Sequence, residues 1–132
     1  VAYFVSRMFL MTAQYDLYLA EPSYLDFPIR TTHNWTLGSE YYLVDWLAVR
    51  GAIFSNNART NEVDPARTDQ APFVNLFGVA GGVSLFRSGT SLTLSSVYTG
   101  GTGQGQAVGG ITQVQTVTHS TLAFCLSGSY QF

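Results

Sequence analysis

The stretch HSTLAFCLSGSYQF, residues 119–132, alternates between two kinds of side chain. Its odd positions, from His119 to Gln131, are small or polar. From residue 122 its even positions are apolar or glycine: Leu122, Phe124, Leu126, Gly128, Tyr130 and Phe132. Successive side chains of a β-strand point to opposite faces, so this period of two predicts a strand with one apolar face. Chain ends usually fray in water, and the apolar end therefore indicates an apolar environment.

Charged residues are scarce in this chain. Asp, Glu, Lys and Arg make up 11% of the 132 residues, whereas a soluble domain has about a quarter. There is no lysine, and Arg87 is the only charged residue from Ala71 to Phe132. Such a surface would aggregate in water, so we expect lipid to cover it. The formal net charge of −2 argues against a nucleic-acid partner.

No apolar run is long enough for a transmembrane helix, which needs about 18 residues. The nearest candidate is residues 1–20, but Arg7, Gln14 and Asp16 interrupt it and its spacing is that of a strand. It also lacks the basic leader and cleavage site of a signal peptide. We therefore expect these residues to belong to a longer protein or to a shared assembly.

The alternation predicts one all-β unit over residues 1–132, with six strands at about 8–19, 34–44, 47–55, 73–87, 90–99 and 116–132. The connections alternate between long loops and short turns. The long loops are 20–33, 56–72 and 100–115, and the short turns are 44–46 and 88–89. Outer-membrane barrels have long extracellular loops, short periplasmic turns and strands of about ten residues.

The two short turns predict the register of their hairpins. A two-residue turn at 88–89 places Leu85 opposite Leu92 and Val83 opposite Leu94, so that the apolar faces match.

A three-residue turn centred on Asp45 places Leu43 opposite Leu47 and Tyr41 opposite Val49. The same register places Glu40 opposite Arg50 on the polar face, where opposite charges stabilise a strand pair.

Alternation alone fits two kinds of protein. In a soluble β-sandwich the apolar faces form the core, and in a membrane barrel they meet lipid. Low charge, strand length and alternating loop lengths favour lipid. We therefore expect an antiparallel transmembrane β-barrel in the outer membrane of a Gram-negative bacterium.

The stretch TLGSEYYLVDWLAVRGAIFSN, residues 36–56, resembles a strand pair in outer-membrane hydrophobic-compound transporters of the long-chain fatty acid transporter family. The resemblance rests on Gly38, Glu40, Tyr41, Asp45, Leu47, Arg50 and Gly51. Residues 77–101 resemble the next hairpin of that family, and residues 126–132 resemble its last strand.

The resemblance implies about 14 strands and an N-terminal plug, of which this chain supplies about six C-terminal strands. Because six strands cannot close a barrel, another segment or chain must supply the rest. The last strand also resembles the signal that the outer-membrane assembly machinery reads. Its positions here are Phe124, Leu126, Gly128, Tyr130 and Phe132, with the glycine one residue off the usual spacing.

Few side chains are candidates for a site. Glu40 and Arg50 form a predicted lumen ion pair, with either a structural or a functional role. Tyr18, Tyr42 and His119 face the interior by parity and either contact a ligand or fill space. Two distant histidines and one cysteine, Cys125, give no metal site or catalytic constellation, so we expect neither an enzyme nor a cofactor.

The expected function is passive uptake of hydrophobic small molecules such as fatty acids, since no energy-coupling motif is present. The expected partners are lipid and lipopolysaccharide, the assembly machinery, a hydrophobic ligand and the missing strands. A structural barrel that holds partner proteins without transport is the alternative.

Overall fold

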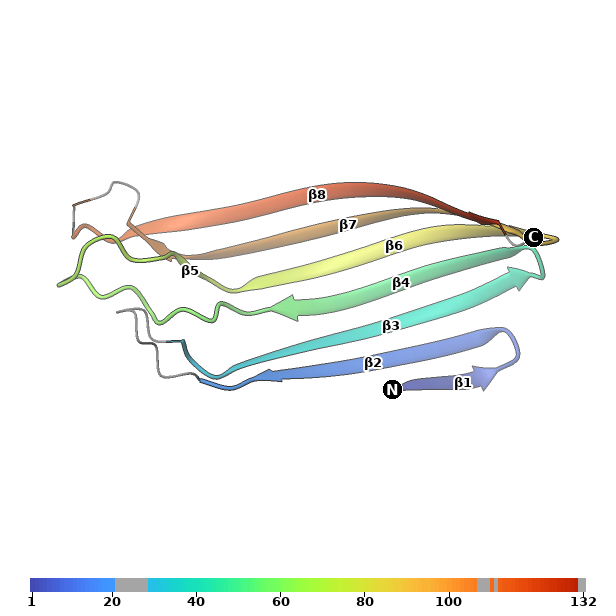
Figure 1. The fold of residues 1–132 in the computed structure, drawn as a ribbon, viewed down its shortest axis with the longest axis horizontal. Coiled ribbons are helices and arrows are strands. Elements are labelled where there is room, and N and C mark those ends of the chain that lie inside the picture. The colour runs from blue at the N-terminus through green and yellow to red at the C-terminus, as the bar shows by residue number, and fades with distance from the viewer. Residues whose placement is uncertain (21–28, 107–109, 111, 131–132) are drawn as a thin grey trace.

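A computed structural model describes residues 1–20, 29–106, 110 and 112–130. Every element in this part of the chain is a β-strand of one antiparallel sheet (Figure 1). The strands are β1 (Ala2–Ser6), β2 (Phe9–Tyr18), β3 (Thr32–Val44), β4 (Leu47–Asn56), β5 (Phe73–Val74), β6 (Leu76–Arg87), β7 (Thr90–Gly105) and β8 (Gln115–Tyr130). No described helix is long and apolar enough to cross a membrane.

The sheet has a simple up-and-down order. Strands β1, β2, β3, β4, β6, β7 and β8 lie side by side, each antiparallel to the next (Figure 1). The turns at 7–8, 45–46 and 88–89 lie at one end of the sheet, which we call the turn end. The longer connections lie at the other end, the loop end.

Strand β5 continues β6 along the same side of β7. Phe77 pairs with Gly100, and Phe73 pairs with Gln104 in the same register. The predicted strand at 73–87 is therefore interrupted only at Asn75.

One strand was not predicted, and two predicted boundaries were wrong. The structure adds β1, and it begins β3 at Thr32 instead of Asn34. It also extends β7 to Gly105, so strand replaces residues 100–105 of the predicted loop 100–115. Short β1 contains a register shift between Phe4 and Ser6, which breaks the alternation. Most of the predicted loop 20–33 lies outside the described residues.

The predicted register is confirmed at most positions. Leu85 pairs with Leu92 and Val83 with Leu94, as expected. Tyr41 also pairs with Val49, and Glu40 with Arg50. The expected pairing of Leu43 with Leu47 was wrong, because the register shifts between Tyr42 and Val44 and places Val44 opposite Leu47. The chain thus reverses through two residues, 45–46, with a local irregularity in β3.

Burial in this sheet is the reverse of that in a soluble protein. Along β6 every odd position is exposed, including Phe77, Val79, Val83 and Leu85, and every even position is buried or half-buried. The even positions include glycine, alanine and serine, and Ser84 is fully buried. Among the described residues only Ala48 and Val63 are buried hydrophobic residues. The sheet therefore has no apolar core of its own.

Candidate functional site on the polar face

The polar face of the sheet contains a hollow of about 300 Å³ that crosses β2, β3, β4, β6 and β7. Its floor consists of small side chains at directly neighbouring positions, among them Gly38, Ala52, Ala80, Gly82 and Ser95. These residues occupy the alternating positions that lie on the polar face of the sheet. Because their side chains are small, the space above the strands is open. The larger side chains that line the hollow are those of Leu10, Glu40 and Arg50.

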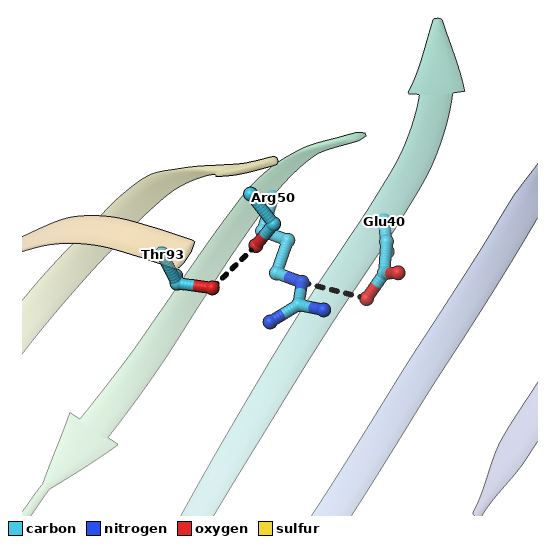
Figure 2. A network of polar contacts seen from close by, with 4 residues as sticks. Glu40, Arg50 and Thr93 are labelled. Carbon is cyan, nitrogen blue, oxygen red and sulfur yellow. Dashed lines mark hydrogen bonds and ion pairs between the residues drawn. The ribbon is translucent and has the colours of Figure 1, made fainter. Parts of the chain in front are cut away.

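The ion pair predicted from the hairpin register lies in the wall of this hollow. Arg50 Nε donates to Glu40 Oε2 at 2.7 Å, across the β3–β4 pair (Figure 2). The Arg50 side chain is 43% exposed and that of Glu40 is 15% exposed. Each charge is therefore partly neutralised by the other while Arg50 still reaches solvent.

Hydroxyl groups continue the polar wall on β6, β7 and β8. Ser84 and Thr93 share a hydrogen bond of 2.8 Å, and Thr93 lies beside Arg50 in Figure 2. Ser91 and Ser129 share another hydrogen bond of 2.8 Å. The Ser84 side chain is fully buried, and its hydrogen bond to Thr93 satisfies it, as buried polar groups require.

The structure separates the three predicted lumen contacts. Tyr42 interacts with Glu40 and stacks on Phe86 at the turn end, with ring centroids 5.9 Å apart. Tyr18 lies at the loop end of β2, where the Arg59 guanidinium is 5.0 Å from its ring centroid.

His119 lies on edge strand β8 and shares a hydrogen bond of 3.0 Å with Thr121. Only Tyr42 is thus near the ion pair, and no shared site of the three predicted contacts forms.

Phe54 is a polar-face residue that the sequence analysis did not identify. It pairs with Gly78, and its ring covers the space that a side chain at position 78 would occupy. The sequence alone could not pair Phe54 with Gly78, because the long connection between β4 and β6 sets no register. In the structure the ring covers the glycine, as an aromatic residue opposite a glycine often does in a β-sheet. Phe54 lies two residues from Ala52 of the hollow on β4, on the same face and toward the loop end.

The long connection after β4 is fixed to the strands by hydrogen bonds. The Asn57 backbone N–H donates to Asn34 Oδ1 at 2.8 Å, and the Asn57 side chain donates to the His33 carbonyl at 2.6 Å. Further along, the Gln70 N–H donates to Gln106 Oε1 at 3.2 Å. The connection thus has a defined conformation and forms a second, polar hollow of about 580 Å³.

The predicted assembly-signal residues lie on one face of β8. Phe124, Leu126 and Tyr130 are exposed, and Gly128 pairs with Leu92. Phe132 lies outside the described residues.

Among the described residues no group of three or more His, Cys, Asp and Glu side chains could hold a metal ion. Cys125 is a free thiol on the exposed edge strand.

Comparison of the chain with protein-family models, curated proteins and solved structures gives no match. The resemblance of residues 36–56 to the fatty acid transporter family therefore stays a prediction.

Proposed function

We propose that this sheet is part of the wall of an outer-membrane β-barrel that passes hydrophobic small molecules by diffusion. The observation that carries the proposal is the reversed burial along β6, where large apolar side chains are exposed and small ones are buried. Burying apolar area stabilises a protein by about 25 cal/mol per Å². Lipid provides that burial for a sheet whose own fold does not.

The height of the apolar face fits a bilayer. On β7 the apolar positions extend from Leu92 to Tyr98, and on β8 they extend from Leu122 to Tyr130. The nine residues from Leu122 to Tyr130 span about 27 Å along the strand, and about 9–11 residues are what a tilted strand needs to cross a bilayer. Beyond this band, positions such as Thr102 and Gln104 are polar.

Aromatic residues lie near both ends of the apolar face. Phe9 and Tyr41 pack edge to face toward the turn end, with centroids 6.2 Å apart. Trp35 and Phe77 lie 6.0 Å apart toward the loop end. Tyr41 and Trp35 are separated by about 20 Å along β3. Two such rows are typical of the aromatic girdles at membrane interfaces.

The polar face supports passage of an uncharged or weakly polar solute. The hollow has a floor of small residues, so a molecule can lie against the backbone. The Glu40 carboxylate already neutralises much of the Arg50 charge, so a solute need not displace a strongly bound counterion. Diffusion down a concentration gradient needs no further chemistry from these residues.

A pair of matched tryptophan variants tests transport. Ala80 lines the hollow, and Val79, its neighbour in sequence, lies on the opposite, apolar face. We expect Ala80→Trp to slow uptake of a radiolabelled long-chain alcohol by intact cells several-fold, because the indole fills the hollow. Val79→Trp should leave uptake unchanged, because the side chain at position 79 lies on the face opposite the hollow. Heat-modifiable migration in detergent gels would show that both variants assemble.

A structural barrel that holds partner proteins is the second candidate. The hydrogen bonds that fix Asn57 and Gln70 favour it, because a loop of defined conformation offers a constant surface to a partner. Suppose that Ala80→Trp assembles and that cells with the wild-type protein take up the alcohol no faster than cells without it. Transport is then excluded, and the structural barrel that holds partner proteins replaces it as the proposed function.

A further inference from the structure

A third hollow, of about 460 Å³, lies at the turn end, between the β3–β4 turn and the β6–β7 hairpin. It is lined by Trp46, Leu85, Phe86, Arg87, Thr90 and Leu92. The Phe86 N–H donates to the Trp46 carbonyl at 2.9 Å, which fixes the two turns side by side. The hollow therefore has a stable frame and a mostly apolar wall with one cation.

Arg87 differs from Arg30, Arg50 and Arg59, each of which has a partner in the described part of the chain. Arg50 is paired with Glu40, and Arg30 and Arg59 lie over aromatic rings. No described residue forms a hydrogen bond or ion pair with the Arg87 guanidinium. Its charge is therefore available to an anion at the rim of the hollow.

The apolar wall adds a second requirement for the ligand. Leu85 and Leu92 pair across the hairpin and are both exposed, and Trp46 is 57% exposed. A free phosphate ion would interact only with the Arg87 guanidinium. A molecule with both a phosphate and an alkyl chain would also bury the leucine and indole surfaces, which is favourable in proportion to the area covered.

We propose that this hollow binds one phospholipid of the membrane leaflet at the turn end. Arg87 donates hydrogen bonds to the phosphate, as the planar guanidinium does at two oxygens, and the Thr90 hydroxyl is a further donor. Trp46 lies at the headgroup level, where tryptophan is enriched. The first acyl segment lies along Leu85 and Leu92. This inference rests on the proposed place of the sheet in a membrane.

The test is native mass spectrometry of the complete native polypeptide purified in detergent and supplied with dioleoyl phosphatidylglycerol. We expect wild-type protein to retain one lipid per complex at lipid concentrations where Arg87→Gln retains about tenfold less, the effect of losing one charge-assisted hydrogen-bonding group. Arg7→Gln is the matched control. Arg7 lies in the β1–β2 turn at this end and also has no described partner, but it does not line this hollow.

Two further comparisons separate lipid binding from simpler explanations. Dioleoylglycerol, which lacks the phosphate, should bind wild-type protein as weakly as phosphatidylglycerol binds Arg87→Gln. An excess of inorganic phosphate should leave the lipid bound. Equal lipid retention by wild type and Arg87→Gln, or displacement by inorganic phosphate, would overturn the proposal.

The heat-modifiability assay tests the membrane location of the sheet separately from lipid binding. Arg87 is the exposed last residue of β6, and its side chain has no partner among the described residues, so Arg87→Gln should assemble normally in the heat-modifiability assay. If the wild-type protein stays dispersed without detergent and shows no heat-modifiable form, the membrane location fails and the lipid site fails with it. If it inserts and the variant retains lipid normally, only the lipid site fails.

Discussion

Glu40 and Arg50 occupy directly paired positions, but their free-energy contribution is limited by solvent. Arg50 is 43% exposed, and exposed ion pairs contribute about 0–1 kcal/mol. We expect a double-mutant cycle of Glu40→Gln and Arg50→Gln to give a coupling energy below about 1 kcal/mol.

Urea unfolding of the protein in lipid vesicles, at low and high salt, measures this energy. Of the two single variants, Arg50→Gln should cost more, because it leaves the less exposed carboxylate without its partner. A coupling energy above about 2 kcal/mol that is insensitive to salt would contradict this account.

Gly89 is the one residue of the β6–β7 turn with a positive φ, of 72°. An L-residue in this conformation costs about 1–2 kcal/mol. We therefore expect Gly89→Ala to lower the free energy of unfolding by about 1 kcal/mol. Gly81→Ala is the control, because a Cβ there meets its nearest atom at 3.9 Å, an ordinary contact. Equal effects of the two substitutions in the same unfolding assay would show that the turn does not need glycine.

At the scale of the element, β5 is held against β7 by glycines. A Cβ at Gly103 would lie 1.9 Å from the Phe73 carbonyl oxygen, and a Cβ at Gly78 would lie 2.1 Å from the end of the Phe54 ring. The ring can turn away, whereas the carbonyl belongs to the backbone. Gly103→Ala should therefore detach β5 and cost about 1–3 kcal/mol, and Gly78→Ala should cost less.

Limited proteolysis distinguishes these two glycines. Detachment of β5 would expose the connection at 57–72, so Gly103→Ala should be cut there faster than wild type while Gly78→Ala should be cut at the wild-type rate. Equal cleavage of all three proteins would show that β5 does not depend on the close approach.

The strand boundaries show where sequence patterns lose their power. Alternation marks strand residues only where one face is apolar. The last residues of β7, from Gly100 to Gly105, are glycine or polar on both faces of the strand. They were therefore predicted as loop. The shift at Val44 was also invisible, because an irregular residue leaves the alternation on either side of it intact.

The ion pair in the wall of the first hollow could be predicted from the sequence, whereas the hollow of Trp46 and Arg87 could not. The Glu40–Arg50 pair follows from a short turn, whose length fixes the register. The hollow of Trp46 and Arg87 depends on the pairing of β4 with β6. The long connection between those strands sets no register, so proximity of the two residues required the structure.

At the scale of the whole molecule, the two edge strands point the same way. Six successive antiparallel pairings separate β1 from β8, so both run from the loop end to the turn end (Figure 1). No described strand pairs with the outer edge of either. Unpaired backbone groups are not viable in lipid, so the proposed wall must be closed by further strands.

Antiparallel closure requires an odd number of added strands, because the strands next to β1 and β8 must both run from the turn end to the loop end. A second copy of this chain would instead place its β1 parallel to β8, which bacterial barrels avoid. We therefore expect native mass spectrometry to find one copy of this sequence per barrel, with the remaining strands supplied by a different segment or chain. An epitope at the start of that closing segment should lie at the turn end, protected from antibody in intact cells and accessible after the outer membrane is permeabilised. A complex of only two copies, or an epitope accessible on intact cells, would mean that the seam is parallel and that the sheet closes by another rule.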